Sequence, residues 1–243
     1  MKNQTKQPSS ENFHQEIKNW EEEDVMQLAN HFHKIDTAKG QFERTSEFVM
    51  ALKDVEKFEK LRAVIEEMRI YLALDTKDKE KQTFFPVLRI KDDDNVLHFF
   101  KLYAVDLRSI DLTKSAEVPE LFKNMICKNW DAIDMHLIDD LFMAKQQQVN
   151  GFETTARVLH YQIDKKIVDS IIKKLPEIKG ITFYSGIDMN KFSDKKQISF
   201  TPVLGFQHDI LTADDVPFGL KNIVEFSKRE TFIEYSRPCP PTC

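Results

Sequence analysis

Apolar positions near the start of each half of the chain recur at helical spacing. In the first half these positions are Trp20, Val25 or Met26, Leu28 and Phe32. In the second half they are Trp130, Ile133 or Met135, Ile138 and Phe142. Because such spacing puts apolar side chains on one helix face, we predict an amphipathic helix at the beginning of each half.

A second helix and two strands are predicted to follow in each half. The apolar positions of the second helix are Phe58, Leu61, Val64 and Ile65, and again Val168, Ile171, Ile172 and Leu175. Asp54 and Asp164 precede these positions and are predicted to cap the helices. Runs rich in β-branched and aromatic residues predict strands over 68–74, 83–90, 181–187 and 198–206.

Several segments leave alternatives open. Residues 46–52 and 156–161 suit either a strand or a helix start, and residues 96–105 and 223–235 suit either a helix or a strand. Pro86 and Pro202 fall inside the second predicted strands. Because proline has no N–H to donate, each predicts an edge strand, a bulge or a backbone nitrogen that points outward, away from a ladder partner.

The two halves also share sequence identities. Both tryptophans of the chain lie in the tripeptide Lys-Asn-Trp, at Trp20 and Trp130, which are 110 positions apart. The same offset aligns Asp54 with Asp164. The offset grows to 113 at the strands that contain Tyr71 and Tyr184, and to 116 at the strands that follow, as expected if loops lengthened between fixed elements.

We therefore expect an α+β fold of two tandem homologous units, each with helices followed by a small antiparallel hairpin or sheet. A pseudo-twofold axis is expected to relate the units, either through a joined sheet or face to face. Unit one spans residues 13–117 and unit two residues 120–237. Residues 1–12 are predicted to be a disordered tail, and residues 238–243 a tail of cysteines and prolines.

Composition narrows the function classes. The net charge of −5 argues against a nucleic-acid binder, which would normally carry a basic surface. The six glycines form no G-x-G-x-x-G or G-x-x-x-x-G-K-[ST] phosphate loop. No apolar run is long enough for a membrane span, and the polar start lacks the apolar stretch of a secretory signal. We expect a cytoplasmic location and neither a membrane nor a nucleic-acid partner.

Tyr71 and Asp75 recur as Tyr184 and Asp188. In a strand, residues four apart lie on the same face, so each tyrosine can share a surface with its aspartate. If the units pack about a twofold axis, the two carboxylates can face each other, and paired carboxylates do acid–base chemistry or bind metal. The simpler interpretation is that each aspartate starts a loop and bonds its own backbone.

Two further sets are weak metal candidates. His136 and Asp140 lie four residues apart in a predicted helix and can share a face, although a solvated ion pair is the commoner arrangement. Cys239 and Cys243 flank a Pro-Pro pair near the end of the chain. They can remain free thiols, form a disulfide, bind zinc between subunits or act as a recognition tag. Cys127 lies in an apolar run and is predicted to be a buried small hydrophobe.

The strand motif at residues 68–75, M-R-I-Y-L-A-L-D, resembles that of an uncharacterised family of bacterial proteins. In that family a helix leads into a G-[IV]-R-[IV]-Y-x-[GA]-x-D strand, and members often end in C-P-P-x-C. Residues 180–188 carry the pattern with Thr182 in place of arginine, and Met68 replaces the leading glycine in the first copy. The resemblance covers about a third of the chain and implies no activity and no catalytic residue.

The sequence favours a non-enzymatic protein that binds or scaffolds an unidentified protein partner or small ligand, with no cofactor. Two alternatives stay open. One is an enzyme or metal-dependent site in a cleft between the units, which would use Asp75, Asp188, Tyr71 and Tyr184. The other is a thiol or metal role for Cys239 and Cys243.

Overall fold

A computed structural model of the protein describes residues 13–36, 41–75, 83–105, 120–149, 152–187, 200–209, 230–234 and 237–239. The elements of the first half are α1 (His14–Glu22), the 3-10 helix η1 (Val25–Phe32), β1 (His33–Asp36), β2 (Gln41–Arg44), β3 (Glu47–Met50), α2 (Leu52–Leu61), the 3-10 helix η2 (Arg62–Val64), β4 (Ile65–Leu74), β5 (Phe84–Asp92) and β6 (Leu97–Ala104).

The second half follows a similar order of elements. They are α3 (Glu120–Ala132), α4 (Met135–Leu141), β7 (Met143–Val149), β8 (Phe152–Arg157), β9 (His160–Gln162), α5 (Lys165–Ser170), the 3-10 helix η4 (Ile172–Lys174), β10 (Ile178–Tyr184), β11 (Val203–His208), β12 (Glu230–Glu234) and β13 (Arg237–Cys239). The fold is thus α+β, with helices and antiparallel strands. Residues 1–12 and 240–243, predicted to be in tails, lie outside the described residues, whereas Pro238 and Cys239 belong to β13.

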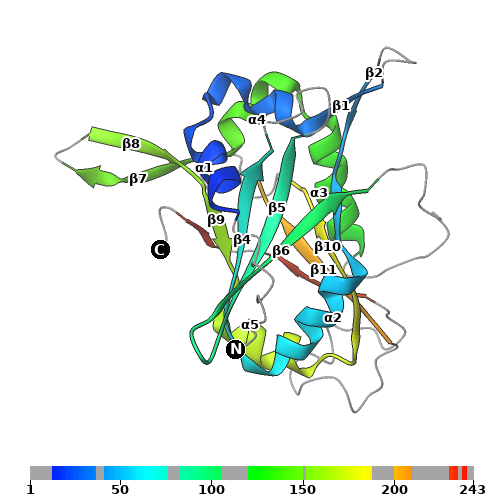
Figure 1. Ribbon diagram of the computed structural model, residues 1–243. Coiled ribbons are helices and arrows are strands. Elements are labelled where there is room, and N and C mark those ends of the chain that lie inside the picture. The colour runs from blue at the N-terminus through cyan, green and yellow to red at the C-terminus, as the bar shows by residue number, and fades with distance from the viewer. Residues whose placement is uncertain are drawn as a thin grey trace, which may run out of the picture.

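In the part of the chain that the structure describes, nine strands form one antiparallel sheet in the order β12-β11-β10-β3-β6-β5-β4-β9-β13. Strands β12 and β13 end this order on opposite sides, yet only residues 235 and 236 separate them along the chain. Three Cα steps span at most about 11 Å, so the sheet curls until its two edges approach each other. Figure 1 shows α4 at one end of the curled sheet and α2 and α5 at the other, with the β1–β2 and β7–β8 hairpins extending from the body on different sides.

The two halves exchange strands within this sheet. Strand β3 of the first half pairs with β10 of the second, with Val49 opposite Thr182. Strand β9 of the second half pairs with β4 of the first, with Gln162 opposite Arg69. Partners in these two pairings correspond at an offset of 113 positions.

The long hairpins of the two halves have equivalent registers. Ile65 pairs with Asp92 in β4–β5, and Ile178 pairs with His208 in β10–β11. Both ladders contain a register shift directly after this first pair. Because the same irregularity occurs at the same place, the two hairpins have the same local geometry.

The hydrophobic core lies inside the curled sheet and draws on both halves. Its centre is a group of aromatic rings from the helices that close one end. Trp20 contacts Phe142 edge to face at 4.9 Å, and Trp130 contacts Phe32 in the same way at 5.1 Å. Phe32 and Phe142 stack at 5.3 Å, and all four rings are fully buried. Each such pair contributes about 0.5–1.5 kcal/mol beyond its buried area.

Each tryptophan also bonds to the opposite half. The indole N–H of Trp20 donates to the carbonyl of Val158 at 2.9 Å, and that of Trp130 donates to the carbonyl of Thr45 at 3.3 Å. These bonds satisfy the one polar atom that burial of each indole would leave without a partner.

Two arginines bond to the helices of the opposite half. Each guanidinium donates to two backbone carbonyls of the helical segment that carries a tryptophan. The sets are Arg157 with the carbonyls of Trp20 (2.8 Å) and Glu23 (2.5 Å), and Arg44 with those of Trp130 (2.5 Å) and Ile133 (3.0 Å). Carbonyls at a helix C-terminus lack intrahelical hydrogen-bond donors, and these two guanidinium groups provide the missing donors.

The first predicted helix of the first half is divided in two. Helix α1 ends at Glu22, and η1 begins after Asp24, whose side chain accepts a bond from the Met26 N–H at 3.0 Å. The equivalent region of the second half is divided between α3 and α4. Helical spacing of apolar residues predicted these segments but not the break between them.

The prediction that Asp54 and Asp164 are both N-caps is half wrong. Asp164 caps α5, and its side chain accepts from the Lys166 N–H at 2.8 Å. Helix α2 instead begins at Leu52 without a side-chain cap, and Asp54 lies in its first turn, paired with Lys57 at 2.9 Å. The reason is that the sequence comparison used an offset of 110 at these helices, whereas the offset in the structure is already 113. Asp54 is therefore not the structural counterpart of Asp164.

Pro86 lies in β5, which is a central strand. Its partner in β4 is Leu72, whose N–H donates to Leu159 and therefore points away from β5. The nitrogen of Pro86 consequently points away from β4, towards β6. Pairing of β5 with β6 begins only at the next residue, Val87. Of the predicted alternatives, the observed one is a nitrogen that faces no ladder partner.

Within the described residues, no helix combines the length and the apolar composition needed to cross a membrane.

Candidate functional site

Tyr71 and Tyr184, predicted as paired site residues, both lie on the outer face of the curled sheet but not together. Each packs outside the main core, whereas their strand neighbours Ile70 and Phe183 belong to it. Tyr71 is on β4 and Tyr184 on β10, with β3, β6 and β5 between these strands in the sheet. Each tyrosine must therefore be considered with its own neighbours.

The predicted aspartates are only partly described. Asp75 follows β4, and its backbone N–H donates to the carbonyl of Thr83 at 2.8 Å across the base of the β4–β5 connection. That bond fits the simpler interpretation, in which the aspartate starts a loop. Asp188 lies outside the described residues, so the pairing of the two carboxylates stays a prediction.

The metal candidates are also dispersed over the fold. His136 and Asp140 lie on α4, where Asp140 is exposed and the side chain of His136 falls outside the described part. Cys239 is the last residue of β13, and Cys243 lies outside the described residues. In the part of the chain that the structure describes, no three His, Cys, Asp or Glu side chains are grouped as a metal site requires.

A different set of polar residues does converge, on the outer face of β4, β5 and β9. It consists of Glu67, Arg69 and Tyr71 of β4, Arg89 of β5 and His160 of β9, and we call it the outer-face cluster. Arg69 lies directly opposite Arg89, and Tyr71 directly opposite His160. Residues two apart in a strand share a face, so β4 places three of these side chains in a row.

The two arginines share one carboxylate. Arg89 donates to Glu67, and Arg69 donates to the other oxygen of the same carboxylate at 3.0 Å. Arg89 also donates to the hydroxyl of Tyr71 at 3.1 Å, and its guanidinium carbon lies 5.4 Å from the centre of that ring. Like charges directly opposite each other destabilise a sheet, and here one carboxylate bonds to both guanidinium groups and offsets one of their two charges.

His160 is the least satisfied member of the cluster. It is 6% exposed and stacks on Tyr71 with 4.7 Å between ring centres. Within the described residues neither of its ring nitrogens has a hydrogen-bond partner, and neither does Nε of Arg89. Burial, together with the positive charges of Arg69 and Arg89, lowers the pKa of His160 to about 4. The imidazole is therefore neutral near pH 7, with one N–H donor and one acceptor unused.

The corresponding place in the second half provides a comparison within the same molecule. At the offset of 113, Tyr184 replaces Tyr71 and Glu47 replaces His160, and these two are again directly opposite. The Tyr184 hydroxyl donates to Glu230 at 3.0 Å, and Lys123 of α3 lies 4.5 Å from the Tyr184 ring centre and 3.9 Å from Glu47. Here the chain's own groups satisfy the polar atoms around the tyrosine.

The charged residues of the outer-face cluster have small counterparts in the second half. By register, Gly180, Thr182 and Gly205 occupy the places of Glu67, Arg69 and Arg89. A Cβ at Gly205 would clash with Glu230 and lie 3.0 Å from the Tyr184 ring. The polar atoms at this place in the second half are thus satisfied by its own side chains, whereas in the described outer-face cluster the ring nitrogens of His160 and Nε of Arg89 have no partner.

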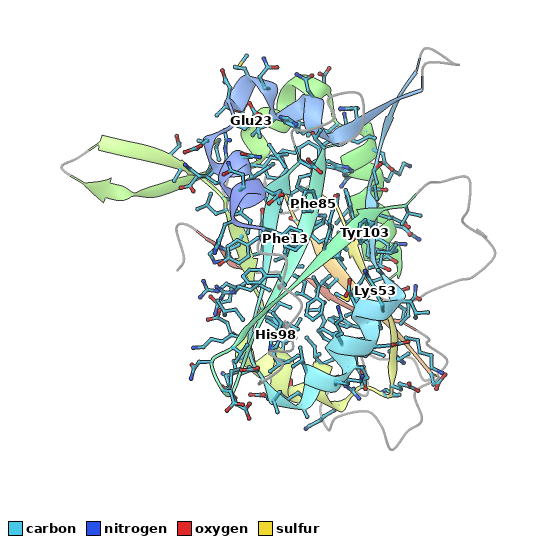
Figure 2. All side chains as sticks on the ribbon, viewed as in Figure 1. Phe13, Glu23, Lys53, Phe85, His98 and Tyr103 are labelled. Atoms are coloured by element: carbon cyan, nitrogen blue, oxygen red, sulfur yellow. The ribbon has the colours of Figure 1, made fainter. Side chains whose placement is uncertain are left out.

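The neighbourhood of the cluster extends along the sheet in two directions. On one side, Phe13 at the start of α1 packs on Phe85 with 5.9 Å between ring centres, which covers the adjoining part of the face (Figure 2). On the other side, β13 places Cys239 as the Cα partner of His160. The predicted cysteine is therefore next to the cluster in the order of strands.

Sequence reasoning found part of this site. Tyr71 was a candidate, and Arg69 lies in the motif that carries the family resemblance. His160 and Arg89 were missed, although one signal was present. Arg69 and Arg89 are charged at positions where the second half has threonine and glycine.

The chain matches no protein-family model, no curated protein sequence and no solved structure.

Proposed function

We propose that the protein is a non-enzymatic binding protein and that its ligand binds at the outer-face cluster. The observation that carries this proposal is His160, a buried imidazole that has two ring nitrogens without a partner in the described chain. A buried polar group without a partner costs about 1–3 kcal/mol. A ligand that bonds to these atoms would recover that cost.

The chemistry of the cluster favours binding over catalysis. Its members are two arginines, a tyrosine, a glutamate that is bonded to both arginines, and a histidine, with no serine, threonine, cysteine or lysine among them. Burial raises the pKa of the Cys127 thiol to about 12, so this cysteine is a poor nucleophile as well. Cys239 lies next to His160 in strand order, but Arg69 and Arg89 oppose a cation there. This disfavours the alternative of a metal held by Cys239 and His160.

We also propose that residues 13–117 and 120–237 are homologous units related by a pseudo-twofold axis. Support comes from contacts that recur with the halves exchanged: the β3–β10 and β9–β4 pairings, the tryptophan N–H bonds and the arginine–carbonyl bonds. In this view the polar site at β4, β5 and β9 has kept groups without a partner, and the equivalent place at β10, β11 and β3 has satisfied them. The likeness to a bacterial family and the cytoplasmic location stay predictions.

The test is a thermal-shift screen of the purified protein against small molecules that include anions, neutral polar compounds and cations. We expect a compound that raises the melting temperature of the wild type and loses its effect in His160→Gln and Arg89→Gln. His98→Gln is the matched control, since this histidine pairs with Asp92 at 2.8 Å in the turn between β5 and β6. Stabilisation that survives both cluster substitutions would place the ligand elsewhere.

A further inference from the structure

We infer that the ligand of the outer-face cluster is a dianionic tetrahedral oxyanion, either free sulfate or a phosphate group, and that His160 takes up a proton when it binds. This inference rests on the proposed function, because it names the ligand class for the same site. It is argued from charge, from hydrogen-bond donors and from the groups that face His160.

The charge of the cluster favours an anion of two charges. Arg69 and Arg89 carry two positive charges and Glu67 one negative, so the cluster has a net charge of +1 while His160 is neutral. Protonation of His160 makes the net charge +2. A dianion then balances the site, whereas a monoanion such as a carboxylate balances it without any proton.

The unused donors match an oxyanion. Nε of Arg89 and one ring nitrogen of His160 each carry an N–H without a described partner, and protonation makes both imidazole nitrogens donors. Oxyanions accept several bonds at once, and guanidinium groups fit their planar faces. Arg69 and Arg89 are each less than a quarter exposed, with side-chain exposures of 23% and 14%. Partial burial strengthens a charged hydrogen bond relative to the same bond in water.

The proton follows from the groups that face the imidazole. Arg69 and Arg89 oppose a positive charge on His160, Tyr71 stacks on its ring, and Glu67 is already shared between the arginines. On the other side of β9, strand β13 has Cys239 at the register position opposite His160 and Arg237 at the position opposite Gln162. A bound dianion would reverse the local field, and the pKa of His160 would rise from about 4. Because one proton is taken up, affinity falls as pH rises through the bound-state pKa, by up to about tenfold per pH unit.

The pairing of two arginines across β4 and β5 supports the same conclusion. Direct opposition of like charges is unfavourable, and the second half of the chain has threonine and glycine at these register positions. The sheet therefore does not need arginines there for its own pairing. An anionic ligand supplies the compensation that a single Glu67 leaves incomplete.

The experiment follows the His160 ring by NMR in histidine-labelled protein, from about pH 5 to pH 8. The buffers contain sodium chloride, sulfate, inorganic phosphate or formate at equal ionic strength. Sulfate is the main probe because it stays dianionic throughout this range. We expect His160 to stay neutral in chloride and formate, and to titrate inside the range in sulfate and phosphate, with its apparent pKa raised by at least one unit.

Variants separate charge from geometry. Arg89→Gln should abolish the sulfate effect, Arg89→Lys should retain part of it, and His98→Gln should leave it unchanged. A folded spectrum of each variant is the control for misfolding. If formate raises the His160 pKa and sulfate does not, the ligand class is wrong and the binding site stands. If no anion shifts the pKa of His160, the inference is overturned. The proposed function is then decided separately, by whether neutral or cationic compounds stabilise the protein in the thermal-shift screen.

Discussion

At the scale of single residues, His160 is buried at an energetic cost, because its ring nitrogens have no hydrogen-bond partner within the described chain. Its neighbours Tyr161 on β9 and Ile70 on β4 belong to the hydrophobic core. The equivalent position in the second half carries Glu47, which lies 3.9 Å from Lys123. This contrast between a satisfied and an unsatisfied position in one sheet is the basis of the proposed binding site.

The first prediction concerns the pH dependence of stability. The pKa of His160 is about 4 in the folded protein and about 6.5 in an unfolded chain. The unfolded state therefore binds more protons between these values, so stability falls as pH decreases from about 6.5 to 4. At most about 3 kcal/mol is lost through this residue. Urea unfolding at a series of pH values should show a shallower dependence for His160→Phe, which keeps the ring stack on Tyr71.

The control for this prediction is Lys166→Met, which changes an exposed side chain and no histidine and should keep the wild-type pH dependence. His33 and His208 also have pKa values lowered by burial, so part of the dependence should remain in His160→Phe. An identical pH dependence in the wild type and in His160→Phe would show that His160 is not held neutral by the fold.

A second prediction at this scale concerns the arginines that bond to helix carbonyls. Arg157→Met removes donors to the carbonyls of Trp20 and Glu23, and Arg44→Met removes those to Trp130 and Ile133. Each change should lower the free energy of unfolding by about 1–3 kcal/mol, because buried carbonyls lose charged donors. Chemical denaturation measures this loss. Lys166→Met, at an exposed position, is the control and should change stability by less than about 0.5 kcal/mol.

At the scale of elements, the sequence predicted the parts that carry their own periodicity. The long hairpins β4–β5 and β10–β11 were predicted within a few residues, since β-branched and aromatic residues dominate them. Strands β3 and β9 were left between helix and strand. They have only four and three residues, and short segments carry too little pattern to distinguish period 2 from period 3.6.

The candidate site was harder to predict because strand exchange builds it. Tyr71 and His160 are 89 positions apart in the chain and become neighbours only because β9 pairs with β4. No local pattern contains that pairing. The sequence did identify Tyr71 as a candidate through its recurrence. It paired this residue with Tyr184, however, and three strands lie between the two tyrosines on the outer face.

A prediction at this scale concerns the docking of α3 on the sheet. A Cβ at Gly186 would lie 2.5 Å from the Ile126 side chain of α3, and the Ile126 carbonyl accepts from the Ile187 N–H at 3.1 Å. Gly186→Ala should therefore displace α3 and lower the free energy of unfolding by about 1–3 kcal/mol.

A double-mutant cycle tests this contact specifically. Ile126→Ala alone should cost about 2–5 kcal/mol through the cavity it leaves. The double variant Gly186→Ala with Ile126→Ala should be more stable than the sum of the single losses predicts, because it removes Cδ1 and Cγ1 of Ile126, the two closest atoms, and leaves only the Cβ of residue 126 at 2.8 Å. Strict additivity would mean that Gly186→Ala acts through the backbone and not through Ile126.

At the scale of the whole molecule, the two halves are bound together more closely than two consecutive domains. Each half donates a strand to the sheet of the other, each tryptophan N–H bonds across, and the aromatic centre combines rings from both. A half on its own would leave β4 or β10 without its neighbour on one side. Such an edge would expose unpaired backbone N–H and C=O groups, so a half that folded alone would be prone to pair with other chains.

The last prediction is that the 243-residue chain unfolds in a single transition. Cooperative two-state unfolding is usual below about 150 residues, and longer chains often unfold domain by domain, so a single transition here would be informative.

The two tryptophans are natural probes of this transition, because one belongs to each half. Trp20→Phe leaves only Trp130 to report, and Trp130→Phe leaves only Trp20. In each variant, the urea midpoint from tryptophan fluorescence should agree with the midpoint from far-ultraviolet circular dichroism. The two midpoints are compared within each variant and not between the variants, since each substitution changes the free energy of unfolding by its own amount. If fluorescence and circular dichroism disagree within either variant, the halves unfold separately, and the exchanged strands do not couple them.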